Sequence, residues 1–542
     1  MSGPLIVQSD KTALLEIDHP HAKDARHDLS IFAELERAPE HIHTYRISKL
    51  GLWNARAAGH DEEFVIDVLE KYSKYPIPPA VTKDIGDLMS RYGKLRIERD
   101  QQGRLLLLSD EKAILAEIGR QKKIKELVIE PVVGGFVLAE WARGAVKQEL
   151  LKIGWPAEDL AGYAKGEPMA ITLDTEDWSL RDYQQQAVGR FQSLGSGVVV
   201  LPCGAGKTLV GAAAMAEVKT NTLILVTNSV SARQWKQELV TRTSLTENQI
   251  AEYSGSTKDL AEVTIATYQI LTTRRGGEYK HLELLNARDW GLIIYDEVHL
   301  LPAPIFKMTA ELQAKQRLGL TATLVREDGR EGDVFSLIGP KRFDALWKDI
   351  EAEGYIAPAN CYEVRIPLTD EQRMKYAISE QEGRFRIAST VEEKMKLTKK
   401  ILENHPDEPA LIIGQYLEQI EQFSTELDIP KLTGETPVDE RERLYKAFRE
   451  KQIPALVVSR VANFSVDLPE ASVAIQVSGS FGSRQEEAQR LGRLMRPKAD
   501  GRAAHFYTLI ARDTVEQDFA QNRQRFLAEQ GYGYEIIDAE QI

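Results

Sequence analysis

Cysteine is almost absent from this sequence, which has two cysteines in 542 residues. Cys203 and Cys361 are too few and too far apart for a disulfide framework, and they lack the paired spacing of cysteine-ligated metal sites. Two such cysteines fit a reducing cytoplasm. We therefore expect neither a small secreted scaffold nor a zinc or iron–sulfur centre.

Long apolar runs are also missing. No stretch approaches the roughly 18 apolar residues that a membrane-spanning helix needs, and the N-terminus has no apolar segment after basic residues. We expect an intracellular protein that is neither secreted nor inserted into a membrane.

Positive net charge is lacking as well. Lysine and arginine number 69 against 82 aspartates and glutamates, so the formal net charge is −13. This balance argues against a general polyanion binder whose affinity comes from bulk positive charge. Any surface that binds nucleic acid must therefore be local.

The length and the hydrophobic pattern predict several domains. A chain of 542 residues is too long for one core, and roughly three or four domains are expected. From about 175 to 345, and again from about 405 to 515, short apolar runs alternate with amphipathic helical segments. This pattern predicts two tandem lobes, each with a parallel sheet covered on both faces. Residues 1–75 are mostly helical in pattern, and residues 90–165 include strand-like segments.

The apolar runs and the expected domains are as follows. In the first lobe the runs are GVVVLP, TLILVT, VTIATY, GLIIYDE and RLGLTAT, and in the second they are ALIIGQ, IPKLTG, ALVVS, VAIQV and HFYTLIA. The expected domains are a helical N-terminal domain (1–85), an α+β domain (86–170), the first lobe (171–345), the second lobe (346–515) and a C-terminal tail (516–542).

Residues 201–211, LPCGAGKTLVG, resemble a phosphate-binding loop, although Leu201 stands where the usual pattern has its first glycine. The apolar run before the loop predicts a strand, and KTLVGAAAMAEV after it predicts a helix. A strand–turn–helix context is the one that such a loop requires. The alternative at this point is a glycine-rich tight turn that happens to carry a lysine.

Each residue of this loop has a chemical reason to bind nucleotide. Gly204, Ala205 and Gly206 bring backbone N–H groups of a helix N-terminus close to phosphates. Lys207 adds a positive charge, and the hydroxyl of Thr208 suits the Mg²⁺ that bridges the phosphates. The loop therefore predicts ATP and Mg²⁺ as cofactors.

A phosphate-binding loop predicts an acidic residue at the end of a neighbouring strand, and LIIYDEVH supplies it. Asp296 follows four apolar residues and is expected to hold Mg²⁺, while Glu297 is expected to accept a proton from the attacking water. His299 lies where coupling between nucleotide and nucleic acid is expected. Alone, these acids would also fit a helix cap or solvated charges.

The second lobe contains QEEAQRLGRLMRPK, which predicts a helix with Gln489, Arg493 and Arg496 on one face. Arginines at such positions can stabilise the transferring phosphoryl group as arginine fingers, an effect of roughly 10³ to 10⁵ in rate. An amphipathic surface helix with basic residues is the alternative.

In their order, these motifs resemble those of XPB-type superfamily 2 DNA helicases, and the resemblance runs through the whole chain. The spelling PCGAGKT is the form of the loop in that superfamily, so the mismatch at Leu201 weighs little. LGLTATLVRED carries motif III and then the Arg326–Asp328 triplet that marks this family. LIGPKRFDALWKDIEAEGYIAP also follows its pattern, and PEHIHTYRISKLGLWNARAAG does so more weakly. The chain lacks the long acidic insertion of eukaryotic members, which indicates a compact bacterial or archaeal form.

The resemblance implies an α/β fold with two tandem RecA-like parallel-sheet lobes preceded by an α+β N-terminal region. It assigns Arg181 and Gln184, in LRDYQQQAV, to the nucleotide base, and Asp467, in VVSRVANFSVDLPEA, to the ribose. The residues that it assigns to nucleic acid or to coupling are Arg233, Trp235, Thr267, Tyr268, His299, Thr321, Thr323, Arg326, Glu327 and Asp328.

The implied activity is ATP-dependent 3′-to-5′ movement on DNA in a prokaryotic cytosol or nucleoid. The implied partners are single-stranded, forked or damaged DNA and, in repair, a nuclease or another repair protein. Residues 86–170 resemble a region that recognises damaged DNA, but Trp141, Trp155 and Tyr163 are as consistent with a core as with base stacking.

Three other functions stay open. A DNA-stimulated ATPase that opens DNA locally without processive unwinding would carry the same motifs. An RNA helicase would share the core motifs, although DEVH with the Arg-Glu-Asp triplet favours DNA. A scaffold that merely retains an ATP fold is disfavoured, because every catalytic residue type is present.

Overall fold

The structure is a computed structural model of the 542-residue chain. It describes the chain apart from residues 1–2, 39–40, 203, 255–257, 274–280, 282–283, 285–286, 303–304, 306–308, 310–311, 314, 323–330, 346, 354–356, 460–470, 479–502, 518–519, 521–523, 525–526 and 529–533. The chain divides into two compact units. The first comprises residues 1–34, 44–201 and 206–345, and the second comprises residues 35–43, 202–205 and 346–542.

The N-terminal part of the chain contains a four-stranded sheet as well as helices. Its strands, in the order β1-β2-β4-β3, are β1 (Leu5–Val7), β2 (Thr12–Glu16), β4 (Ile42–Arg46) and β3 (Glu34–Arg37). Its helices are α1 (Ala22–Leu29), α2 (Lys49–Ala57), α3 (Glu62–Tyr72) and α4 (Pro79–Met89). Our expectation of a helical domain over residues 1–85 was wrong in this respect. The cause is that β2 has the sequence TALLE, in which good helix formers adopt a strand through tertiary pairing.

Residues 95–159 form a five-stranded sheet in the order β7-β8-β6-β5-β9. Its strands are β5 (Leu95–Arg99), β6 (Leu105–Leu108), β7 (Val128–Val132), β8 (Gly135–Leu138) and β9 (Ala157–Asp159), and its helices are α5 (Lys112–Ile118), α6 (Lys122–Lys125), η1 (Glu140–Ala142) and α7 (Arg143–Lys152). Arg143 on α7 bonds Asp159 on β9 at 2.7 Å, and Lys147 bonds the same carboxylate at 2.7 Å. These charges fix the helix to the sheet.

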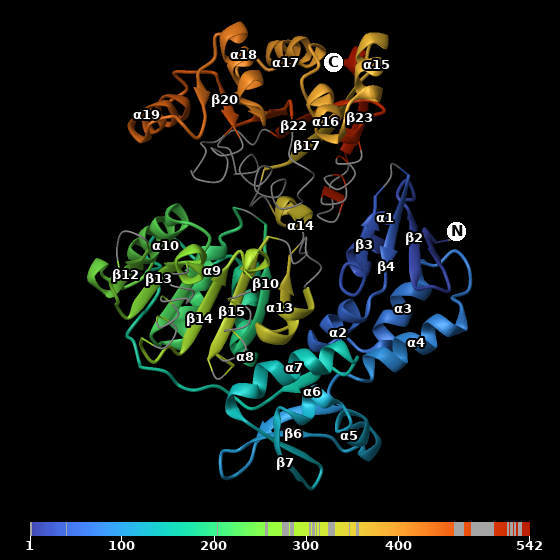
Figure 1. Cartoon of the computed structure of the whole chain (residues 1–542), viewed down its shortest axis with the longest axis vertical. Coiled ribbons are helices and arrows are strands. Elements are labelled where there is room, and N and C mark those ends of the chain that lie inside the picture. The colour runs from blue at the N-terminus through green and yellow to red at the C-terminus, as the bar shows by residue number, and fades with distance from the viewer. Residues whose placement is uncertain are drawn as a thin grey trace. The chain divides into compact units, whose positions relative to one another are not determined.

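The first lobe is a seven-stranded parallel sheet in the order β12-β13-β11-β14-β15-β10-β16. Its strands are β10 (Ser196–Val200), β11 (Thr222–Val226), β12 (Ile250–Tyr253), β13 (Val263–Thr267), β14 (Leu292–Asp296), β15 (Gln316–Thr321) and β16 (Lys341–Asp344). Its helices are α8 (Asp182–Leu194), α9 (Lys207–Val218), α10 (Ser229–Arg242), η2 (Glu247–Gln249), α11 (Tyr268–Thr272), η4 (Val298–Leu300) and α13 (Glu331–Leu337). The next helix, α14 (Trp347–Ala352), belongs to the second unit. The parallel lobe predicted from the apolar runs is confirmed (Figure 1).

The second unit contains another seven-stranded parallel sheet, in the order β19-β20-β18-β21-β22-β17-β23. Its strands are β17 (Ala359–Ile366), β18 (Ala410–Gly414), β19 (Lys431–Leu432), β20 (Ala455–Ser459), β21 (Val473–Gln476), β22 (Ala504–Ala511) and β23 (Tyr534–Asp538). Its helices are α15 (Asp370–Ile378), α16 (Gln381–Ser389), α17 (Glu393–Asn404), α18 (Leu417–Leu427), α19 (Val438–Arg449) and η5 (Ala539–Gln541). The segment expected to be a C-terminal tail contributes β23, whereas the expected domain boundaries stay a prediction.

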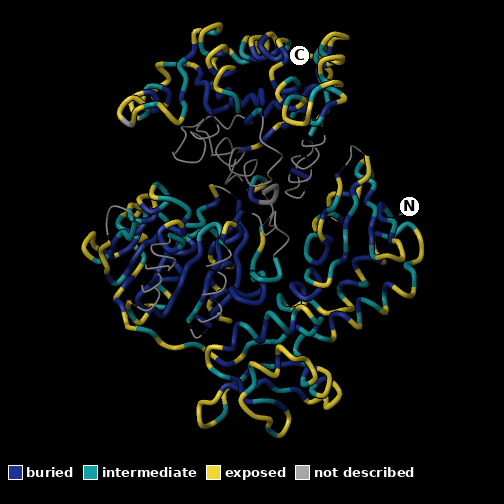
Figure 2. Tube along the Cα trace, viewed as in Figure 1, coloured by how far each residue is buried: buried dark blue, intermediate teal, exposed yellow. Residues whose placement is uncertain are grey.

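The central strands of both lobes are buried on both faces. All residues of β10, β11, β13, β18 and β20 are buried, which explains their continuous runs of valine, isoleucine and leucine (Figure 2). Parallel strands of this kind present their carboxyl ends at one edge of the sheet, where ligands bind in such folds. No helix among the described residues is long and apolar enough to cross a membrane.

Candidate active site

The predicted phosphate-binding loop joins β10 to α9. Gly206 is the residue before α9 and has φ +77°, and Gly204 has φ +82°. Both angles lie in the left-handed region that glycine adopts without strain. A Cβ on Gly206 would lie 2.4 Å from Nε2 of Gln184, so the loop also needs glycine for space. Lys207 and Thr208 form the first turn of α9, and a helix N-terminus of this kind favours an anion.

The predicted acids lie at the end of β14. Asp296 is the last residue of the strand, and Glu297 follows it with φ +49° and ψ 53°. This left-handed conformation is costly for a residue with a side chain, and such strain is characteristic of functional sites. The backbone N–H of Glu297 donates to Asp296 Oδ1 at 3.0 Å, which ties the two acids together.

An ion pair joins the loop to the acids. Lys207 Nζ lies 2.6 Å from Glu297 Oε1, and the two side chains are 11% and 16% exposed. β15 alone separates the strands that precede these residues, β10 and β14. The structure therefore brings the predicted phosphate-binding lysine and the predicted base within bonding distance.

The two acids differ in their proton affinity. Burial raises the pKa of Asp296 to about 6, repulsion from Glu297 adds to this rise, and Lys207 opposes it. Burial would also raise the pKa of Glu297, but the charges of Lys207 and His299 outweigh it and hold that pKa below its ordinary value. Glu297 is therefore the acid that carries the negative charge more readily, as a proton acceptor must.

Two aromatic side chains hold Asp296 in place. The indole Nε1–H of Trp235, on α10, donates to Asp296 Oδ2 at 2.9 Å. The hydroxyl of Tyr268, at the start of α11, donates to the main-chain carbonyl of Asp296 at 2.7 Å. Trp235 and Tyr268 are 1% and 4% exposed. They fix the direction in which the carboxylate points.

His299 connects the acids to β15. Its Nδ1 lies 2.6 Å from Thr321 Oγ1 and 3.5 Å from Glu297 Oε2. His299 and Thr321 are buried. A change in the position of Thr321 would therefore reach Glu297 through one imidazole ring.

Gln184 occupies the flank of the loop. It is 1% exposed, its Oε1 accepts from the backbone N–H of Arg181 at 2.9 Å, and its amide nitrogen faces Gly206. Arg181 Nη1 donates to the hydroxyl of Tyr183 at 3.1 Å. Both residues assigned to the nucleotide base therefore lie at the N-terminus of α8, beside the loop.

Most residues assigned to nucleic acid or coupling are buried. Thr267, Tyr268, Trp235, His299 and Thr321 are at most 7% exposed, so they contact the acids and the sheet rather than a surface. Thr267 Oγ1 accepts from the backbone N–H of Ile270 and caps α11. Arg233 on α10 is exposed. The coupling role of the set stays a prediction.

Several assigned residues lie outside the described residues. They are Thr323, Arg326, Glu327, Asp328, Asp467, Gln489, Arg493 and Arg496. Their roles stay predictions.

The donor set of the site fits a magnesium ion. A hydroxyl at Thr208 and a carboxylate at Asp296 are hard oxygen ligands of the kind that Mg²⁺ prefers. Burial is the main cause of the raised pKa of Asp296. A divalent cation beside this carboxylate would favour its charged form.

The sequence patterns did not identify Trp235 and Tyr268 as supports of Asp296. No local signal could have done so, because their partner lies 61 and 28 positions away in the chain.

Three family models match separate parts of the chain. A model described as "ERCC3/RAD25/XPB C-terminal helicase" matches residues 350–542. A model described as "Type III restriction enzyme, res subunit" matches residues 177–326, and one described as "Helicase conserved C-terminal domain" matches residues 5–132.

Comparison with curated proteins finds relatives that span the chain. The DNA 3′-5′ helicase XPB of Kineococcus radiotolerans is 62% identical over 541 residues, which cover 100% of this chain and 97% of that protein. The DNA 3′-5′ helicase XPB of Mycobacterium tuberculosis is 62% identical over 541 residues, covering 100% and 98%. The general transcription and DNA repair factor IIH helicase/translocase subunit XPB/SSL2 of Saccharomyces cerevisiae is 30% identical over 609 residues, covering 99% and 72%.

Proposed function

This chain belongs to the XPB family of superfamily 2 DNA helicases and is an ATP-dependent DNA helicase, and we propose that it hydrolyses ATP where Lys207, Asp296 and Glu297 meet. The observation that carries this proposal is the 2.6 Å ion pair between Lys207 and Glu297, which brings the phosphate-binding loop to the proposed base.

Each residue of this site has a separate task in hydrolysis. Lys207 leaves Glu297 when ATP binds and pairs with the β- and γ-phosphates, which the N–H groups of the α9 N-terminus also contact. Glu297, then released from the lysine, accepts the proton of the attacking water. Thr208 and Asp296 would hold Mg²⁺, which neutralises phosphate charge. Gln184 and Arg181 recognise the base.

The second unit completes the site in this proposal. Gln489, Arg493 and Arg496 reach the phosphates when the lobes close, and Asp467 contacts the ribose. The support for these roles is the motif order in the sequence and the match of residues 350–542 to the C-terminal helicase model. Cycles of closing and opening would then drive movement along DNA.

DNA is held chiefly through its phosphates, so binding should have little sequence preference and should weaken as salt rises. We further propose a role in DNA repair within a prokaryotic cytosol or nucleoid, with forked or damaged DNA as substrate and a repair nuclease as a candidate partner. Support comes from the names of the relatives, since the yeast protein is named as part of a DNA repair factor.

Local opening by a translocase is the second candidate function. The observation that favours it is the printed name of the yeast relative, a "helicase/translocase subunit".

Two substrates decide between these functions. Strand displacement on a 3′-tailed duplex, with a 5′-tailed duplex as the control for direction, measures unwinding. Displacement of a third strand from a triplex measures translocation alone. Unwinding of the 3′-tailed duplex supports the helicase, and triplex displacement without unwinding supports the translocase.

The sugar preference needs its own measurement. ATP turnover is compared with single-stranded DNA and with RNA of the same sequence. Stimulation by DNA and not by RNA supports the proposal, whereas equal or greater stimulation by RNA contradicts it.

A further inference from the structure

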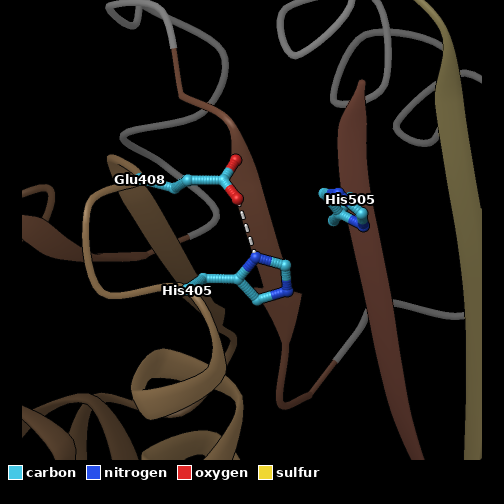
Figure 3. Close-up of side chains that lie close together, drawn as sticks. All are labelled: His405, Glu408 and His505. Atoms are coloured by element: carbon cyan, nitrogen blue, oxygen red, sulfur yellow. Dashed lines mark hydrogen bonds and ion pairs between the residues drawn. The ribbon is translucent and has the colours of Figure 1, made fainter. Parts of the chain in front are cut away.

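Two histidines and a glutamate gather in the second unit, and none of the three is among the residues assigned to ATP or DNA. His405 follows the last residue of α17, Glu408 precedes β18, and His505 is the second residue of β22. Each offers one nitrogen or oxygen atom, and these atoms all lie within 4.8 Å of one another. Figure 3 shows that His405 and Glu408 come from one connecting segment, whereas His505 comes from a separate strand.

The hydrogen bonds of His405 orient its ring. Nδ1 lies 2.9 Å from Glu408 Oε1, and Nε2 lies 3.0 Å from the hydroxyl of Tyr507. Tyr507 is on β22, two residues after His505, so both side chains lie on the same face of the sheet. A ligating histidine usually has such a partner on its other nitrogen, which fixes the ring for the metal.

The cluster is largely removed from solvent. The side chains of His405 and Glu408 are 11% and 15% exposed. The second carboxylate oxygen of Glu408, Oε2, is buried and accepts no hydrogen bond from the described residues. Leaving such an oxygen without a partner is costly, and a bound cation would remove that cost.

We propose that His405, Glu408 and His505 bind one divalent transition-metal ion of the zinc class. Two imidazoles and a carboxylate form a donor set typical of zinc, with ligand distances of about 2.0–2.2 Å, and a water molecule can take the fourth position. Magnesium and calcium prefer sets made of oxygen alone, so the histidines disfavour them.

Binding requires small movements and the His405 tautomer that leaves Nδ1 without a proton. Two ligands of a tetrahedral zinc ion lie about 3.3 Å apart, given zinc–ligand bonds of about 2 Å, so rotation of the His505 side chain must close the remaining gap. The ion binds Nδ1 of neutral His405, so the single ring proton must be on Nε2, from which it donates to the hydroxyl of Tyr507.

The site lies at the amino-terminal edge of the second sheet. Glu408 precedes the first residue of β18, His505 lies at the start of β22, and β21 separates these two strands. Ligands of parallel α/β sheets, nucleotides included, bind at the opposite, carboxyl edge. The ion would therefore crosslink the α17–β18 segment to β22 and stabilise the lobe without entering hydrolysis.

Zinc binding by the full-length chain tests this proposal. The protein is stripped with a chelator, excess Mg²⁺ is added to keep zinc from the phosphate site, and zinc is titrated against a chromophoric chelator. We expect one zinc ion per chain and a higher unfolding temperature of the second unit when zinc is present. Absence of binding in the wild-type chain overturns the proposal.

Four variants locate the ion. Glu408→Gln keeps a polar partner for His405 but removes the charge, and His505→Asn removes a ligand, so both should lose at least about 100-fold in zinc affinity. Tyr507→Phe keeps all three ligands and loses the outer hydrogen bond, which should cost about 10-fold to 100-fold in affinity. His21→Gln removes an exposed histidine of the first unit and should bind zinc as the wild type does.

Unfolding temperatures measured in chelator separate ligand loss from misfolding. The site is supported if the variants unfold near the wild-type temperature without zinc and if added zinc raises their unfolding temperature less than it raises that of the wild type. If His505→Asn fails to fold, the zinc affinities of Glu408→Gln and Tyr507→Phe still test the proposed site. Zinc affinities in these two variants equal to that of the wild type, or affinity lost only in His21→Gln, overturn the proposal.

Discussion

The indole Nε1 of Trp235 donates a hydrogen bond to Asp296 Oδ2 at 2.9 Å, and this bond links α10 to the carboxylate that ends β14. The same indole also packs on the phosphate-binding helix, because a Cβ on Gly211 of α9 would lie 2.4 Å from the ring atom Cη2. One buried side chain therefore contacts both parts of the nucleotide site. In the proposed site, Trp235 would act through Asp296, as a positioning residue.

Replacing Trp235 with phenylalanine removes the hydrogen bond and keeps an aromatic ring. We expect weaker Mg²⁺ binding, because partners that orient a metal ligand are typically worth about 10-fold to 100-fold in metal affinity or activity. The measurements are the Mg²⁺ dependence of fluorescent nucleotide binding and of DNA-stimulated ATP turnover.

Trp290→Phe is the matched control for this variant. Trp290 is fully buried in the same lobe, and its Nε1 donates to the carbonyl of Leu284 at 3.0 Å, away from the acids. Both variants lose packing and one indole hydrogen bond, but Trp235→Phe alone should change the Mg²⁺ dependence. An equal change in both would mean that Trp235 has only a packing role.

The Lys207–Glu297 ion pair predicts that substitutions of its two partners affect ATP affinity differently. Glu297→Gln should slow turnover by about 10²-fold to 10⁴-fold, the usual worth of a general base. It should not weaken ATP binding, because it releases Lys207 from its 2.6 Å pair. Lys207→Ala should weaken both binding and hydrolysis. Nucleotide titration and steady-state turnover with DNA measure the two quantities.

A half-exposed acid of the same lobe provides the control. Glu238 on α10 lies 3.8 Å from Arg242, and Glu238→Gln should change neither quantity. DNA-stimulated turnover retained in folded Glu297→Gln protein would exclude Glu297 as the base.

The sequence predicted the parallel lobes because their central strands are continuous apolar runs. Runs such as LIIYD in β14 are buried on both faces, and burial of that kind leaves a continuous apolar signal. The polar edge strand β16, KRFD, gives no such signal. The short strand β2 has helix-forming residues and is stabilised by pairing with β1.

The sequence placed Lys207 and Thr208 together because they are neighbours at the start of α9, and their roles stay predictions. It could not identify contacts that depend on strand order. Trp235 meets Asp296 across 61 positions, and His405 meets the strand of His505 about a hundred residues later in the chain. Such contacts follow from the arrangement of the sheet, which local periodicity does not encode.

The buried charges at Asp159 predict an effect on stability. Asp159 is 12% exposed and pairs with Arg143 and Lys147, which are 1% and 8% exposed. Asp159→Asn would leave two buried cations without a counter-charge and should destabilise the first unit by about 3–5 kcal/mol. The change in the free energy of unfolding is measured by denaturant titration. Asp110→Asn, at an exposed pair with Arg96, should cause no measurable change.

The same carboxylate predicts how stability depends on pH. Burial alone would raise the pKa of Asp159, but Lys147 and Arg143 outweigh it and hold the pKa below its ordinary value. A carboxyl with a lowered folded pKa stabilises the protein above its unfolded pKa of about 3.9, and this stability is lost as pH falls below that value. The wild type should therefore lose stability between about pH 5 and pH 2 more steeply than Asp159→Asn. If the stability of the two proteins fell equally steeply with pH, the lowered pKa of Asp159 would be contradicted.

Arg326, Glu327 and Asp328 follow the end of β15 closely, where Thr321 bonds His299 beside the proposed base. The triplet itself lies outside the described residues, so its role rests on the sequence. An arginine can contact a phosphate of the displaced strand, and two acids can repel DNA, so the segment suits the opening of a duplex. We expect none of the three to be needed to bind ATP or to activate water.

Replacing all three with alanine should therefore separate the two activities. We expect basal ATP turnover near the wild-type value and a severe loss of strand displacement on a 3′-tailed duplex, measured in parallel on the same preparation. Thr321→Ala is the contrasting variant, since loss of its 2.6 Å contact with His299 should disturb ATP turnover as well. Equal loss of both activities in the triple variant would indicate a structural role, and loss of neither would indicate a solvated loop without function.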